Sequence, residues 1–135
     1  MRSRWMVAGA ASFVALEVLG LAFAAALGRL GATSLTPSTV SALLIGMAVS
    51  GAWFGLLFSY VHPWLPSWSI IQRGIVVSTT LNVLAAVLFQ GPAIVSSAQF
   101  WAGAAMSIVT GALFGWMGLQ LGADRQGEQH DEDAP

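Results

Sequence analysis

Hydrophobic residues fall into four long runs along the chain, and short polar or turn-forming segments separate them. The runs cover residues 5–27, 38–61, 70–89 and 98–122. A helix rises about 1.5 Å per residue and the hydrocarbon core of a bilayer is about 30 Å thick, so one span needs about 20 residues. Each run is long enough, and the pattern predicts four transmembrane helices.

The segments between the runs contain residues that begin and end helices. Thr36 and Pro37 form an N-cap followed by proline at the first helical position, which predicts the start of the second helix. Pro63 and Pro66 separate the second run from the third, and Gly91 follows the third. Because the connections are short, neighbouring helices are expected to be antiparallel. We therefore predict an all-α, polytopic membrane protein built as a four-helix bundle.

The composition excludes several classes of protein. Hydrophobic residues make up 56% of the chain and charged residues 8%, against roughly 25% charged residues in soluble proteins. The net charge of −1 gives no basic surface for nucleic acid, and the absence of Cys removes thiolate metal sites and nucleophiles. We expect no cofactor and no metal. The predicted transmembrane domain covers residues 1–122, and the acidic segment 123–135 is predicted to be a disordered cytoplasmic tail.

The distribution of arginine predicts the orientation of the chain. With the N-terminus in the cytoplasm, that side carries Arg2, Arg4, Arg73 and Arg125, and the other side carries Arg29. Positive residues concentrate in cytoplasmic loops, so both termini are expected in the cytoplasm and the chain in the plasma membrane. Aromatic rings prefer the interface between membrane and water, and Arg side chains reach toward it. The interface anchors expected on the cytoplasmic side are Trp5, Tyr60, Trp64, Trp68 and Arg73.

An internal repeat relates the two halves of the chain. Residues 49–55 match residues 109–115 at an offset of 60, and residues 16–19 match residues 81–84 at an offset of 65. We interpret this as a duplicated two-helix hairpin, with both copies entering the membrane from the same side as parallel repeats. The alternative interpretation is chance recurrence of small apolar residues.

Small residues recur at four-residue spacing in the second and fourth runs. Such rows let helix backbones approach closely, which drives association where lipid supplies no hydrophobic force between helices. The rows predict close helix packing, either within the chain or in a homodimer or a complex with another membrane subunit. The predicted packing residues are Gly51, Gly55, Gly103, Ser107, Gly111 and Gly115.

One polar residue from each predicted helix lies near the middle of the membrane. Glu17, Ser50, Asn82 and Thr110 each lie 12 residues after the start of their run, which is about 18 Å along a helix. A carboxyl group at this depth costs about 2.5–3.5 kcal/mol, so Glu17 is expected to face the bundle interior. Asn82, at the matching position of the other repeat, is its expected hydrogen-bond partner.

Two hypotheses explain Glu17. In the first, the carboxyl group binds a proton or a cation, because intramembrane acids mark ion pathways. Alternatively, it only links the hairpins by hydrogen bonds to Asn82 and nearby hydroxyls.

The segment Ala15-Leu16-Glu17-Val18-Leu19-Gly20 resembles the first helix of the small multidrug resistance transporters. Those proteins have four helices and one acid in the first helix, and they work as dimers. The resemblance implies that Glu17 binds a proton and a cationic substrate alternately. It covers six residues, and the family's third-helix aromatic motif and its Lys after the first helix are missing here.

The sequence favours a non-catalytic helical bundle or accessory membrane protein, with a small proton- or cation-coupled transporter that uses Glu17 as the alternative. Enzyme activity is not expected, because no paired carboxylates, metal-ligand cluster or nucleophile with an adjacent base occurs. The lipid bilayer is the expected partner.

Overall fold

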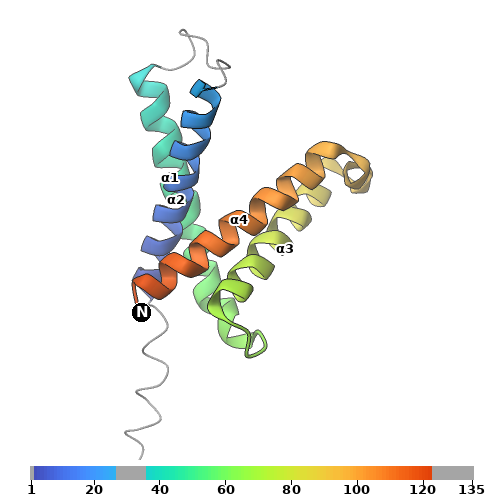
Figure 1. Ribbon diagram of the computed structural model, residues 1–135. Coiled ribbons are helices and arrows are strands. Elements are labelled where there is room, and N and C mark those ends of the chain that lie inside the picture. Colours follow the sequence, from blue (N-terminus) through green and yellow to red (C-terminus); the bar gives the residue numbers. More distant parts are fainter. Residues whose placement is uncertain (1, 27–35, 123–135) are drawn as a thin grey trace, which may run out of the picture.

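A computed structural model of the chain describes residues 2–26 and 36–122. The described residues form four long helices, and all four are long and apolar enough to cross a membrane. Two short 3-10 helices, η1 and η2, lie in the connections that follow α2 and α3 (Figure 1). The elements are α1 (Arg2–Ala26), α2 (Pro37–Val61), η1 (His62–Trp64), α3 (Ile70–Gln90), η2 (Pro92–Ser96) and α4 (Ala98–Gln120).

Side chains next to the helices set where they begin. Thr36 caps α2 by accepting a hydrogen bond from the backbone N–H of Thr39 at 3.2 Å. Ser69 and Gln72 form a reciprocal capping box at the start of α3. The end of α3 is fixed by Gly91, whose φ of 80° is a conformation that glycine adopts without strain.

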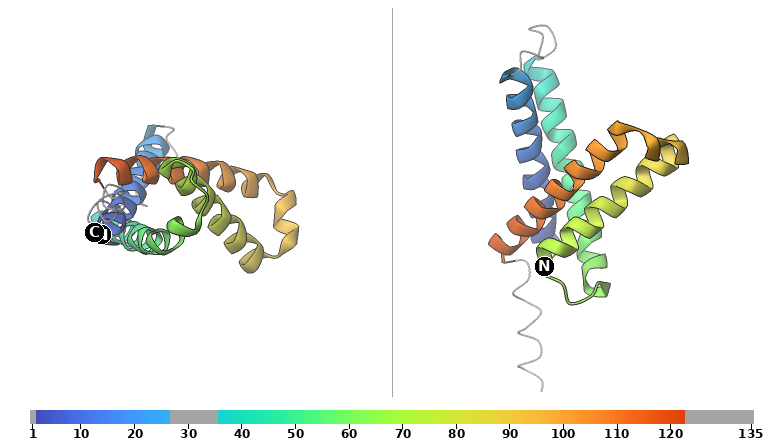
Figure 2. Two further views of the ribbon diagram at one scale, coloured as in Figure 1. Left: turned by 90° about the horizontal axis from the view of Figure 1, so that it is seen from below. Right: turned by 45° about the vertical axis from the view of Figure 1, so that its right-hand side comes forward.

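The four helices form two hairpins that diverge from one end. Helix α1 packs along α2, and α3 packs along α4. The hairpins meet mainly where α1 contacts α4, near the N-terminus, and they separate toward the α3–α4 connection (Figures 1 and 2). The molecule therefore has a closed end, which holds the start of α1, and an open end, which holds η2.

Glycine backbones bring the helices of each hairpin into direct contact. In the first hairpin, Gly9 of α1 lies against Gly51 and Gly55 of α2. In the second, a Cβ atom on Gly111 would lie 2.5 Å from the carbonyl oxygen of Gly74. Real Cβ atoms do not approach backbone atoms so closely, so these positions require glycine.

Aromatic rings fill the closed end between the hairpins. The ring centroids of Trp5 and Phe58 are 4.9 Å apart, and those of Phe58 and Phe114 are 4.8 Å apart. His62 stacks on Phe58 with a centroid distance of 5.3 Å. Together with Phe54, which contacts Phe114 edge-on, these five residues form what we call the aromatic cluster.

Three sequence expectations need adjustment. Trp5 was expected at the lipid interface, but only 2% of its surface is exposed, because its ring fills the space that Gly118 leaves on α4. Helix α1 begins three residues before the predicted start, since Arg2 and Arg4 find partners at the closed end. Helix α4 ends before residue 122, where Gly122 has a φ of 61°. The predicted tail, 123–135, lies outside the described residues, as do Arg29 and Arg125.

Candidate functional site

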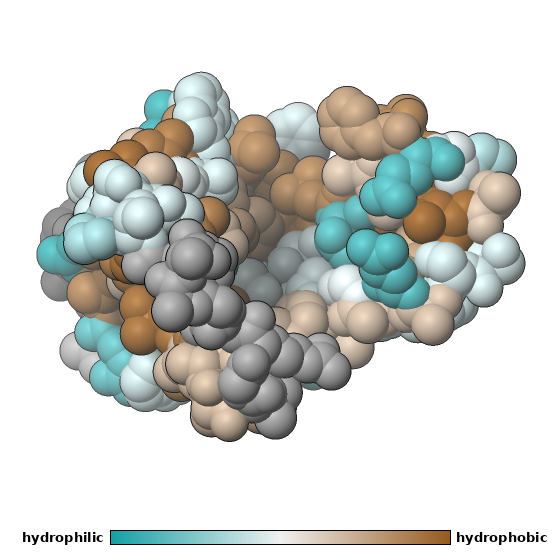
Figure 3. All heavy atoms as spheres, turned by 90° about the horizontal axis from the view of Figure 1, so that it is seen from above, coloured by the Kyte–Doolittle hydropathy of each residue, from teal (hydrophilic) through white to brown (hydrophobic). Residues whose placement is uncertain are grey.

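A cleft of about 610 Å³ lies between the diverging hairpins, and all four helices line it. Seen from above, the surface is hollowed between the two hairpins (Figure 3). Such a volume is in the range of small-molecule sites, about 300–1,000 Å³. The polar residues that line the cleft are Glu17, Ser78, Asn82, Ser107 and Thr110.

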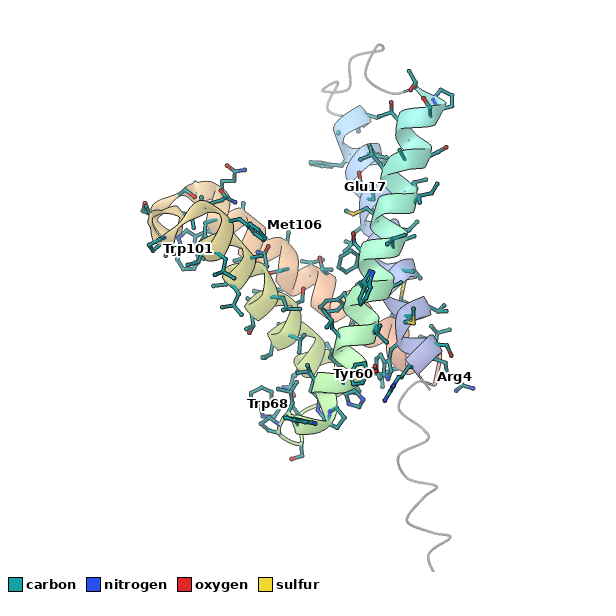
Figure 4. The ribbon with its side chains drawn as sticks, turned by 180° about the vertical axis from the view of Figure 1, so that it is seen from behind. Arg4, Glu17, Tyr60, Trp68, Trp101 and Met106 are labelled. Atoms are coloured by element: carbon teal, nitrogen blue, oxygen red, sulfur yellow. The ribbon has the colours of Figure 1, made fainter. Side chains whose placement is uncertain are left out.

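Glu17 lies on the side of α1 that faces the second hairpin. Its side chain is half-buried, and it is the charged residue among the described residues that line the cleft. Across the gap, Met106 lies on the side of α4 that faces the first hairpin (Figure 4). Glu17 and Met106 therefore line the cleft from opposite hairpins.

Asn82 enters the same cleft from α3. Its amide nitrogen lies over Gly103, 3.5 Å from where a Cβ atom would be. Within the described part of the chain, no hydrogen bond joins Glu17 and Asn82, in contrast to the sequence expectation. The reason is the divergence of the hairpins, which leaves open space at the depth of these two side chains.

The hydroxyl groups of the cleft are held by their own helix. Thr110 donates a hydrogen bond to the carbonyl of Met106 at 2.8 Å, and Ser107 donates one to Ala104 at 2.7 Å. Each hydroxyl oxygen keeps lone pairs that can accept a further hydrogen bond. Ser50, the fourth residue of the predicted polar layer, is exposed on α2 and does not line the cleft.

The apolar wall of the cleft was not anticipated from the sequence. It consists of two aromatic rings, two leucines and two methionines, all of which face the same space. A helical spacing signal was present, because Phe13, Leu16, Glu17 and Gly20 lie at i, i+3, i+4 and i+7 of α1 and therefore share one face. The apolar lining residues are Phe13, Leu16, Met47, Phe54, Leu81 and Met106.

The predicted packing residues divide into two groups. Gly51, Gly55, Gly111 and Gly115 contact the neighbouring helix of their own hairpin. Gly103 and Ser107, from the same row of small residues as Gly111, line the cleft instead. The row on α4 therefore serves the hairpin at one end and the cleft at the other.

The arginines at the closed end bind protein groups. Arg2 donates to the hydroxyl of Tyr60 at 2.7 Å and lies over its ring. Arg4 donates to the carbonyl of Gly122 at 3.1 Å, and Arg73 donates to that of Pro66 at 3.1 Å. The rings of Tyr60, Trp64 and Trp68 are exposed at this end, as an interface anchor requires.

The described residues contain no group of three or more His, Asp or Glu that is placed to hold a metal ion. Comparison of the chain with protein-family models, with curated proteins and with solved structures found no match. The resemblance to the small multidrug resistance transporters is therefore limited to the six residues around Glu17, and the cleft is the feature that bears on function.

Proposed function

We propose that this chain is a small proton- or cation-coupled transporter in which Glu17 is the ion-binding group and the cleft between the hairpins is the transport site. One observation carries the proposal: the intramembrane carboxyl group lines an open cleft of about 610 Å³ instead of a packed interface. A group that only linked the hairpins would be expected in contact with the other hairpin, and Glu17 has open space in front of it.

The cost of burying the carboxyl group supports this choice. An acid in the middle of a span costs about 2.5–3.5 kcal/mol unless it faces a water-filled cavity or a partner group. The cleft supplies such a space, with Asn82, Ser78 and Thr110 as further hydrogen-bonding groups. Water, a proton or a bound cation in the cleft then stabilises Glu17, which is a condition that transport requires.

We further propose that the closed end faces the cytoplasm in the cell membrane. Arg2, Arg4 and Arg73 are grouped at this end, and positive residues concentrate on the cytoplasmic side of membrane proteins. The cleft then opens toward the outside. The aromatic cluster, whose member Phe54 also lines the cleft, lies on the closed-end side of it, and we propose that the cluster blocks passage in this conformation.

The proposed internal duplication gives the transporter a symmetric frame. Contacts of Gly9 with Gly51 in the first hairpin correspond to contacts of Gly74 with Gly111 in the second, at the offsets of the sequence repeat. The same offsets relate Glu17 to Asn82, which line the cleft from opposite sides. Repeats related by an axis along the membrane normal are common in transporters, where one repeat rocks against the other around a central site.

The test is ion flux in proteoliposomes. We expect the wild-type protein to admit protons or radioactive Na⁺ under an imposed potential, and the Glu17→Gln variant to lower the flux to that of empty liposomes. The control is Ser50→Ala, which changes a residue of similar depth outside the cleft and should keep the flux. Flux that persists in Glu17→Gln, or no flux in the wild-type protein, would overturn the proposal.

A second candidate function is a self-associating or accessory bundle that transports nothing. It is favoured by Gly46, which does not line the cleft and around which no atom lies within 4 Å of an added Cβ atom, so that another helix has room to approach. Cross-linking in liposomes distinguishes this candidate. Association that is lost in Gly46→Leu, together with an absence of flux, would support it over transport.

A further inference from the structure

A second, smaller cavity lies at the open end of the second hairpin. It has a volume of about 210 Å³ and is bounded by α3, η2 and the start of α4. The side-chain amides of Asn82, Gln90 and Gln99 line it, and the ring of Phe100 is buried against it. We call this cavity the amide chamber.

The chemistry of the amide chamber is that of neutral oxygen ligands. Each amide offers a carbonyl oxygen with two lone pairs, and the described residues that line the chamber include no charged group. Amide and carbonyl oxygens are ligands of hard cations, whose hydration shell they replace. A volume of about 210 Å³ leaves room for a small ion that keeps part of its water.

The two helix ends beside the chamber do not decide whether it prefers a cation or an anion. It lies where α3 ends, at Gln90, and the end of a helix carries partial negative charge from its last carbonyl groups. The start of α4 contributes a field of the opposite sign, so the two helix ends largely cancel. Selection for a cation then comes from the amide oxygens and from the carboxyl group further inside.

Asn82 connects the amide chamber to the cleft, because its side chain lines both. Gly103, which carries no side chain, also lines both cavities. A Cβ atom at position 103 would lie 3.5 Å from the amide nitrogen of Asn82. An ion that enters at Gln90 and Gln99 therefore meets Asn82 next and Glu17 after it.

We infer that the amide chamber is the entry site of the coupling ion, and that this ion is a small monovalent metal cation that Asn82 passes to Glu17. The inference rests on the proposed transport function and names its coupling ion. It also assigns separate roles to the two cavities. In this assignment the apolar wall of the cleft binds a transported solute, and the neutral amides of the chamber bind the ion.

The test measures cation binding separately from flux. The full chain in nanodiscs is unfolded by heat in NaCl or KCl, with N-methylglucamine chloride as the control for ionic strength. We expect Na⁺ or K⁺ to raise the unfolding temperature in a saturable way, and the double variant Gln90→Leu, Gln99→Leu to weaken apparent affinity about tenfold, as the loss of ligand-shell groups does at other ion sites. The matched control is Gln120→Leu, at the opposite end of α4, which should bind as the wild type does.

Two further variants separate this inference from the proposed function. Gly103→Ala adds one methyl group beside the Asn82 amide without a severe clash, and the variant should fold and slow Na⁺ entry. Glu17→Gln should abolish flux and keep the cation-dependent stabilisation. Stabilisation that is lost in Glu17→Gln but unchanged in the glutamine variants would place the ion at Glu17 alone and overturn the inference. Equal stabilisation by all three salts would also overturn it.

Discussion

Gly9 and Gly51 meet backbone to backbone across the first hairpin, where a Cβ atom on Gly51 would lie 2.6 Å from the carbonyl carbon of Gly9. A side chain at this contact could fit only if the two helices moved apart along their length. We therefore predict that Gly51→Ala lowers the free energy of unfolding by about 1–3 kcal/mol, the usual cost of overpacking. Thermal unfolding in detergent measures this change. Gly46→Ala, in open space on the same helix, is the control and should be neutral or stabilising.

A second prediction concerns the contact between the hairpins. The ring of Trp5 occupies the space beside Gly118, so a methyl group in Gly118→Ala would meet the indole. Because Trp5 is buried, its ring cannot turn away, and we expect destabilisation of about 1–3 kcal/mol. Replacing the indole by a smaller side chain with Trp5→Leu in the same chain should recover part of this loss. If the destabilisation of the double variant equals the sum of the two single destabilisations, the contact between Trp5 and Gly118 is contradicted.

The link between the first and last helices gives a third prediction. Arg4 donates hydrogen bonds to the carbonyls of Leu121 at 3.4 Å and Gly122 at 3.1 Å, which the end of α4 otherwise leaves unpaired. Arg4→Ala should cost about 1 kcal/mol of unfolding free energy, the net value of a typical hydrogen bond. Chemical denaturation of both proteins tests this. Arg4→Lys keeps the positive charge, so its free energy of unfolding should fall by less than that of Arg4→Ala.

Water in the cleft can be tested directly, because the chain contains no Cys. A single cysteine at Met106, which lines the cleft, should react with a membrane-impermeant thiol reagent added outside cells. A cysteine at Phe114, which is fully buried, should be protected. A cysteine at Ile108, which is 46% exposed on α4, should face lipid and also stay unreactive. Reaction of all three, or reaction from the cytoplasmic side only, would contradict the proposed water-filled, outward-open cleft.

The cost of the intramembrane acid makes a fifth prediction. Replacing Glu17 with Leu should favour membrane insertion of α1 by about 3–4 kcal/mol, because the acid costs about 2.5–3.5 kcal/mol and Leu contributes a small gain. A glycosylation assay of helix insertion measures this difference. The same variant should show no flux, so a more easily inserted protein would be an inactive one. The control is Val18→Leu, at a neighbouring exposed position, which should change the free energy of insertion little.

The helices could be predicted from the sequence because apolar length and capping residues are local signals. The four spans, the Thr36 cap and the stop at Gly91 were all readable in this way. Glu17, Asn82 and Thr110 were predicted from the sequence to lie at one depth, and all three line the cleft. Depth does not fix direction around the helix axis, however, and Ser50, at the same depth, points away from the cleft.

The arrangement of the hairpins could not be predicted. In a soluble protein, the apolar face of a helix marks the side that packs, but these helices are apolar on every side. Trp5 illustrates the difficulty, because a tryptophan near a helix start is expected at the lipid interface, and only its fit beside Gly118 of a distant helix explains its burial. The open cleft has the same origin, since lipid supplies no hydrophobic force to close it.

The fit of Trp5 on Gly118 has a consequence for how the two halves recognise each other. At the offsets of the proposed repeat, Trp5 corresponds to Ile70 and Gly118 corresponds to Phe58, so a large residue in one half stands opposite a small one in the other. A residue as large as Phe58 in the place of Gly118 would leave no room for the indole of Trp5. Under the proposed repeat, the second hairpin therefore offers Trp5 a space that a second copy of the first hairpin would not, so the two halves would not be interchangeable.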